Sequence, residues 1–300
     1  MKEAVTLVEV GPRDGLQAWK HPIATSARIG LIERLRKAGV ARMEVGSFVS
    51  PKHVPRMADT AEVMDAVGSR AEPGDMVLVA NARGLEQAIA QGARAIAVFT
   101  AASDAFAQKN IGCTVAASLD RFAPLVETAR AAGINVRGYI STITDCPYSG
   151  EVAPQAVVPV ARALTEMGCG EISLGETLGR ATPRRIAAVI AAVAAHVPMD
   201  RLAAHFHDTY GMGVANVREA VRLGVRTVDA AVGGLGGCPF APGATGNVAS
   251  EDIVYLLHGE GFATGIDLDA LLDAAAYCRD AMGIAPVSRV FNALRGGGLR

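Results

Sequence analysis

The sequence predicts a (β/α)₈ barrel, and three observations favour this fold class. Short runs rich in β-branched residues alternate with longer amphipathic segments along most of the 300 residues. Many of the longer segments end at a glycine, the residue that commonly follows the last turn of a helix. About 260 residues hold eight such strand–helix units, the number that closes a barrel of parallel strands. A doubly wound sheet would show the same alternation with fewer units.

Strands and helices are predicted in strict alternation. The predicted strands are the short apolar runs Val5–Val10, Arg42–Gly46, Met76–Ala80, Ala95–Thr100, Asn135–Ser141, Gly170–Leu174, Arg201–His205 and Thr227–Val232. The predicted helices carry apolar residues at helical spacing and cover residues 25–38, 58–68, 84–91, 115–132, 154–167, 183–196, 213–223 and 249–259. Pro154 and Pro183 stand at helix starts, where proline fits the first turn.

Residues beyond the eighth unit form a separate C-terminal segment. We predict a helix over Leu268–Met282 and a frayed tail at the three glycines that begin with Gly296. No linker, charge run or low-complexity stretch divides the chain before this point. We therefore expect a catalytic barrel over residues 1–262 and a C-terminal helical extension over residues 263–300, packed on the barrel.

Composition and charge exclude several classes of function. The formal net charge of -1 argues against nucleic acid as a partner, because phosphate binding needs a basic surplus. No run of about 18 apolar residues predicts a membrane span. The N-terminus leads straight into a strand pattern without a signal peptide, so we expect a cytoplasmic protein. The five cysteines show no CxxC pair, which indicates free thiols and disfavours cysteine-bound zinc.

Two histidines separated by a single residue are the most informative feature of the chain. An apolar strand pattern leads into His205 and His207. Alternation along a strand points residues i and i+2 to the same side, so both imidazoles can reach one metal ion. Burying two imidazoles without a shared purpose is costly, which favours a metal site over a structural pair.

Polar residues at the ends of other predicted strands supply further candidate ligands. Arg13 and Asp14 follow the first strand, Glu44 lies in the second, and Asn247 lies beyond the eighth. In barrels of this type functional groups sit where strands run into the following loops. A carboxylate, two imidazoles and an amide oxygen suit a divalent cation of the Mg²⁺ or Mn²⁺ type.

Each of these residues also has a purely structural interpretation. Asp14 before Gly15 is typical of a turn, and Glu44 could be a core carboxylate bonded to the backbone. Cys238 could be a small apolar filler. It lies, however, in a glycine-dense loop of the kind that closes over substrate, which makes a functional thiol an equal alternative.

Several motifs together resemble the 3-hydroxy-3-methylglutaryl-CoA lyase family. They are Val8–Gln17, Glu44–Lys52, Ala101–Ser103, Lys109–Ile111, Arg137–Tyr139, Cys146–Tyr148, His205–Gly211 and Gly234–Phe240, with Gly246 and Asn247 behind them. They occur in the family's order and at similar spacing, across about residues 5–292. The resemblance implies a metal-dependent barrel that cleaves 3-hydroxy-3-methylglutaryl-CoA into acetyl-CoA and acetoacetate, and a possible homodimer.

The resemblance also implies roles for individual residues. The divalent cation, Mg²⁺ or Mn²⁺, would be held by Asp14, His205, His207 and Asn247. Arg13 would stabilise the enolate oxygen, Cys238 would transfer a proton, and Glu44 would support the ligands. The acyl-CoA substrate would be bound by Gln17, Ser47, Lys109, Asn110 and Glu176, with Lys109 and Asn110 near the CoA moiety. The sequence leaves open whether Asp14 or His205 removes the hydroxyl proton.

One departure from the family pattern allows an alternative substrate. The family usually has Asp where this chain has Glu176, whose side chain is one methylene longer, and Arg180 adds a cation to the same loop. The pocket could therefore prefer a related 3-hydroxy-3-carboxymethyl acyl-CoA or a citramalyl-CoA-like thioester.

Two other functions remain open from the sequence. A Claisen synthase of the isopropylmalate or homocitrate type would share the histidine pair and the Arg-Asp pair. Such synthases usually have Glu where this chain has Leu16, and many carry a C-terminal regulatory domain. A non-catalytic barrel that binds acyl-CoA is the third interpretation.

Overall fold

Eight parallel strands close into a barrel, as the sequence predicts. A computed structural model describes residues 2–237 and 246–296. The strands follow the order β1-β10-β9-β8-β5-β4-β3-β2 around the barrel, and β1 pairs with both β10 and β2 to close it. Their bounds are β1 (Thr6–Glu9), β2 (Arg42–Phe48), β3 (Asp75–Val79), β4 (Ala95–Ala101), β5 (Asn135–Ser141), β8 (Glu171–Glu176), β9 (Leu202–Phe206) and β10 (Thr227–Ala230).

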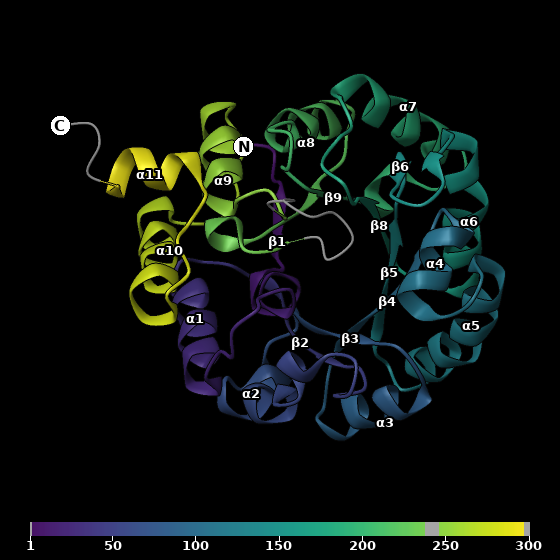
Figure 1. The fold of residues 1–300 in the computed structure, drawn as a ribbon, viewed down its shortest axis with the longest axis horizontal. Coiled ribbons are helices and arrows are strands. Elements are labelled where there is room, and N and C mark those ends of the chain that lie inside the picture. Colours follow the sequence, from purple (N-terminus) through teal and green to yellow (C-terminus); the bar gives the residue numbers. More distant parts are fainter. Residues whose placement is uncertain (1, 238–245, 297–300) are drawn as a thin grey trace.

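Helices form a ring around the strands (Figure 1). Those predicted from the sequence are α1 (Thr25–Lys37), α2 (Thr60–Ala66), α3 (Ala82–Ala90), α5 (Val115–Ala131), α6 (Pro154–Met167), α7 (Pro183–Ala194), α8 (Gly213–Arg222) and α9 (Ser250–Gly259). Each helix buries one apolar face against the barrel. In α7 the buried residues are Ile186, Val189, Ile190 and Val193, at the spacing of one helical stripe. The strands are buried on both faces, which explains why they read as continuous apolar runs.

Several smaller features were not predicted, among them helix α11 (Arg289–Arg295) and the following three. A short helix α4 (Asp104–Ile111) follows β4, and a two-stranded antiparallel sheet pairs β6 (Asp145–Cys146) with β7 (Gly150–Glu151). A π-helical turn (Gly11–Gly15) follows β1 directly. These three additions lie after strands, on the side of the barrel where the predicted site residues gather.

The C-terminal segment packs on the outside of the barrel. Helix α10 (Leu268–Met282) lies beside α1, and α11 (Arg289–Arg295) lies beside α9 (Figure 1). This segment contacts two loops of the barrel: between the helices Val287 N donates to Gly233 O at 2.8 Å, and at the start of α11 Arg289 Nη1 donates to Asp208 Oδ2 at 2.8 Å. Within the described ranges, no helix is long and apolar enough to cross a membrane.

Candidate active site

The predicted metal ligands converge at the carboxyl ends of the strands. Asp14 comes from the turn after β1, His205 from β9, and His207 follows β9 directly. One ligand atom from each of these three residues lies within 4.8 Å of the other two. Asn247 joins them, because its Nδ2 donates to Asp14 Oδ2 at 2.8 Å and its backbone bridges that of His207. In this orientation the amide nitrogen of Asn247 faces Asp14, so the amide must turn over to offer its oxygen to a cation.

The charges of this cluster suit a divalent cation. Burial alone would raise the pKa of Asp14, but the positive charges of Arg13 and the two histidines outweigh it and lower that pKa to about 2. Burial, with the charge of neighbouring His205, lowers the pKa of His207 to about 4. At neutral pH the cluster therefore offers an anionic carboxylate and a neutral imidazole from His207. That donor set, with an amide oxygen within reach, fits Mg²⁺ or Mn²⁺.

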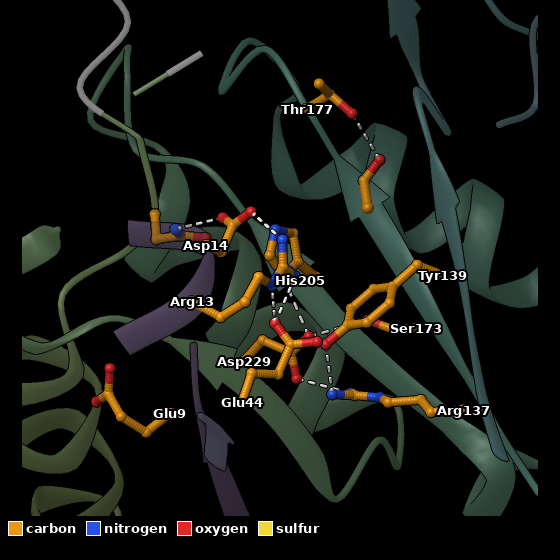
Figure 2. A network of polar contacts seen from close by, with 12 residues as sticks. Glu9, Arg13, Asp14, Glu44, Arg137, Tyr139, Ser173, Thr177, His205 and Asp229 are labelled. Atoms are coloured by element: carbon orange, nitrogen blue, oxygen red, sulfur yellow. Dashed lines mark hydrogen bonds and ion pairs between the residues drawn. The ribbon is translucent and has the colours of Figure 1, made fainter. Parts of the chain in front are cut away.

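Arg13 lies beside the metal ligands and is held by two carboxylates (Figure 2). Its Nε donates to Glu44 Oε2 at 2.6 Å, and its Nη1 donates to Asp14 Oδ1 at 2.7 Å. Glu44 is fully buried on β2, and burial raises its pKa although Arg13 opposes this. The guanidinium is thus a cation beside the cluster, and the Glu44 carboxylate fixes its orientation. The hydrogen bond that Glu44 accepts comes from Arg13, so Glu44 supports Arg13 beside the three predicted metal ligands.

A second buried network contacts His205 at its Nδ1 atom, and the sequence pattern did not predict this network. Asp229 on β10 accepts hydrogen bonds from Arg137 on β5 and Ser173 on β8, and its Oδ2 lies 3.1 Å from His205 Nδ1 (Figure 2). Tyr139 meets the His205 ring edge-on, with 5.7 Å between centroids. A charged residue inside an apolar strand pattern, such as Asp229 or Arg137, is the signal that could have revealed this network.

A cavity of about 1110 Å³ opens over this cluster. Its lining includes Arg13, Asp14, Gln17, Tyr139, His205 and His207, and also Lys52, His53, Lys109, Asn110 and Arg121. Asp14 supplies the carboxylate of the described lining, while four of the lining residues are Arg or Lys. The cavity therefore favours an anionic ligand that places its phosphates among these cations. Lys109 and Asn110 reach it from α4.

Two predicted substrate-binding residues do not line the described part of this cavity. Ser47 is buried on β2, where its backbone N–H donates to Thr60 Oγ1 at 3.0 Å. The Glu176 carboxylate is fully buried at the end of β8 and accepts from Arg180 N at 3.2 Å and Thr144 Oγ1 at 3.4 Å. Burial raises the pKa of Glu176 to about 7. The longer side chain thus binds the turn that follows β8, and a direct contact with substrate stays a prediction.

Cys238 lies outside the described residues, but the start of its loop is described. Gly233 has φ +64°, a left-handed conformation that favours glycine. Its N–H donates to the buried Glu251 Oε1 at 2.8 Å, and its carbonyl accepts from Val287 N. Glu9 fixes the neighbouring residue through a 2.9 Å bond from Val232 N. Two buried carboxyls and the C-terminal segment therefore anchor the loop that carries Cys238.

Glu251 makes the stability of the protein pH-dependent. Burial raises its pKa from 4.5 to about 8, and the hydrogen bond from Gly233 N opposes this only in part. In the unfolded chain Glu251 therefore ionises at a lower pH than in the folded protein. Its contribution to the free energy of unfolding is complete below pH 4.5 and decreases as the pH rises to about 8. Each pKa unit corresponds to about 1.4 kcal/mol. We expect Glu251→Gln to flatten the dependence of the unfolding free energy on pH between pH 5 and 8.5, as measured by urea denaturation.

A matched substitution isolates this effect. Glu86 is exposed on α3, so Glu86→Gln should keep the wild-type slope. Burial also raises the pKa of Glu9, to about 7. The unfolding free energy of Glu251→Gln should therefore still depend on pH, but less steeply than that of the wild type. Equal slopes for the wild type and Glu251→Gln would show that Glu251 is not the titrating group.

Sequence comparison with known proteins shows the family of this chain. The family model described as HMGL-like matches residues 4–277. The chain belongs to the HMGL-like family. The hydroxymethylglutaryl-CoA lyase of Pseudomonas mevalonii is 48% identical over 292 residues, 97% of each chain. The 3-hydroxy-3-isohexenylglutaryl-CoA/hydroxy-methylglutaryl-CoA lyase of Pseudomonas aeruginosa is 49% identical over 294 residues, 98% of each chain.

Solved structures of HMGL-like proteins have the same fold. A hydroxymethylglutaryl-CoA lyase from Pseudomonas aeruginosa superposes with a TM-score of 0.94 at 49% identity and covers 98% of both chains. An HMG-CoA lyase from Acinetobacter baumannii in complex with coenzyme A and 3-methylmalate gives a TM-score of 0.93 at 34% identity, covering 99% of this chain and 97% of that one. The similarity extends over the barrel and the C-terminal helices together.

Proposed function

We propose that this chain is a divalent-metal-dependent lyase that cleaves 3-hydroxy-3-methylglutaryl-CoA into acetyl-CoA and acetoacetate. One observation carries the proposal: Asp14, His205 and His207 converge beside Arg13 at the base of one large cavity. The relatives at 48% and 49% identity carry names for this activity. Asp14, His205 and His207, with Asn247, would hold Mg²⁺ or Mn²⁺.

The chain's own side chains fit a retro-Claisen cleavage. A divalent cation held by Asp14, His205 and His207 would lower the pKa of the substrate's tertiary hydroxyl. Asp14 accepts the hydroxyl proton, or His205 does so where its Nε2 is not bound to the cation, since both line the cavity. Arg13 faces the thioester oxygen that becomes negative as the C–C bond breaks, and a donor aimed in this way lowers the activation barrier by about 3 kcal/mol. Cys238 returns a proton to the enolate carbon.

The outer part of the cavity fits the CoA moiety. Lys52, Lys109 and Arg121 line it, and cationic side chains of this kind bind phosphate groups. Gln17 and Asn110 add amide groups to the same lining. The structure of the Acinetobacter baumannii relative with coenzyme A supports an acyl-CoA ligand here. A homodimer and a cytoplasmic location remain predictions.

A coupled assay tests the activity. Purified protein is treated with EDTA, and the loss of thioester and the formation of acetoacetate are followed before and after Mg²⁺ or Mn²⁺ is added. We expect turnover that depends on either cation. Condensation of acetyl-CoA with a 2-oxo acid, without cleavage, would instead establish a Claisen synthase. Binding of acyl-CoA without any change in thioester would establish a binding barrel.

A second candidate substrate has a longer group at C3. The Pseudomonas aeruginosa relative carries the name of an isohexenylglutaryl-CoA lyase as well, and this chain lines its cavity with Leu78, Ala80, Phe99 and Ile140. These apolar side chains fit an added alkyl or alkenyl group. The comparison of kcat/KM for thioesters with a methyl, a longer alkenyl or a carboxyl group at C3 tests this. A clear preference for the methyl compound would remove the alternative.

A further inference from the structure

We propose that Asp229 is a positioning residue that fixes the ring of His205 with its Nε2 toward the cation site. The inference rests on the proposed function, because it assumes that His205 is a metal ligand. Asp229 lies on β10 and its side chain is completely buried. Its Oδ2 lies 3.1 Å from His205 Nδ1, on the side of the ring away from Asp14 (Figure 2).

Residues of two neighbouring strands, β5 and β8, hold Asp229 in place. Arg137 Nη2 on β5 donates to Asp229 Oδ1 at 2.6 Å, and Ser173 Oγ on β8 donates to Oδ2 at 3.0 Å. Both oxygens are therefore occupied, and neither can rotate without breaking a buried bond. Arg137 is itself fixed by Glu171 at 2.8 Å and by the Tyr139 hydroxyl at 3.0 Å. The Asp229 carboxylate thus has one orientation, and its contact with His205 Nδ1 restricts the orientation of the imidazole.

The hydrogen bond also selects the tautomer of His205. An ionised carboxylate only accepts hydrogen bonds, so His205 Nδ1 must carry the proton. When the ring is neutral, Nε2 is then the free nitrogen, and a carboxylate behind a ligating histidine is a known way to orient it. Tyr139 restrains the ring from the side, at 80° to its plane. Together these contacts fix the orientation of the His205 ring and leave the lone pair of Nε2 available to a cation.

Asp229→Asn tests the inference, because Arg137 decides how the amide must sit. Only the amide oxygen can face the Arg137 donor, so the amide NH₂ takes the place of Oδ2 beside His205 Nδ1. His205 must then accept at Nδ1 and carry its proton on Nε2, the nitrogen that faces the cation. We expect Mn²⁺ affinity to fall by about 10- to 100-fold in titrations of the metal-free protein.

Nuclear magnetic resonance reads the tautomer without any activity assay. The chain has six histidines, so ¹⁵N-histidine labelling gives a tractable spectrum, and His205→Ala assigns the signal. In the metal-free wild type we expect the Nδ1–H tautomer of neutral His205, and in Asp229→Asn the Nε2–H tautomer. A wild-type ring in the Nε2–H form would overturn the proposal even if the variant failed to fold.

Glu171→Gln is the matched control. It makes the same carboxylate-to-amide change on the opposite side of Arg137, and the structure gives Glu171 bonds to Arg137 and Arg42 rather than to His205. We expect wild-type tautomer and Mn²⁺ affinity within about threefold of the wild type. A folded Asp229→Asn protein that behaves like this control would overturn the positioning role. If the wild type binds Mn²⁺ tightly yet cleaves no thioester, the positioning role stands and only the proposed activity fails.

Discussion

Replacing Arg13 with methionine is expected to lower kcat by roughly a hundred- to a thousandfold, the usual cost of losing one aimed donor at a developing oxyanion. Arg13 lines the cavity and is held from two sides, by Glu44 at 2.6 Å and by Asp14 at 2.7 Å. Methionine keeps the apolar stem of the side chain but is shorter and removes every donor. The loss of thioester under saturating substrate and Mg²⁺ measures the effect.

The same substitution leaves a buried carboxylate without its partner, so stability needs its own control. Glu44 has no exposed surface, and breaking a buried ion pair costs about 3–5 kcal/mol. Arg13→Met combined with Glu44→Gln removes that unpaired charge. We expect the double variant to regain most of the lost melting temperature but none of the lost kcat. Near-normal turnover in a folded Arg13→Met protein would mean that Arg13 does not stabilise the transition state.

The fold was predictable because each strand–helix unit repeats a simple local pattern. All eight barrel strands and the helices that follow them occur within two residues of their expected bounds. The elements that escaped prediction are too short to show a period, as with the two residues of β6 and of β7. Helix α4 had usable signals that periodicity alone overlooks: Ser103 caps its start and Gly112 ends it with φ +70°.

The site was predictable where its residues are close in sequence or follow strands. His205 lies on β9, His207 follows that strand directly, and Asp14 lies in the turn after β1. Asp229 was missed because its partners come from β5 and β8, and nothing local shows that strands so far apart in sequence meet inside a barrel. Glu176 is a different case. It ends β8, where the sequence predicts a substrate-binding group, and its carboxylate accepts a hydrogen bond from Arg180 N, so its contact with substrate stays a prediction.

Replacing His205 with alanine is expected to abolish nearly all turnover and to weaken Mn²⁺ binding by at least about 100-fold. The variant loses one imidazole of the metal cluster and one of the two candidate bases for the substrate hydroxyl. The fold should survive, because Asp229 keeps its bonds to Arg137 and Ser173. Calorimetry of the metal-free protein measures the affinity, and circular dichroism checks the fold.

His207→Ala is the matched control that separates a ligand from a base. His207 belongs to the same cluster but, within the part of the chain that the structure describes, no carboxylate stands behind it as Asp229 stands behind His205. If both histidines act only as ligands, saturating Mn²⁺ should restore turnover to a similar extent in both variants. If His205 takes the hydroxyl proton instead of binding the cation through Nε2, saturation should restore His207→Ala alone, and Asp14 is then excluded as the principal base. Near-normal turnover of His205→Ala without added metal would remove His205 from the site altogether.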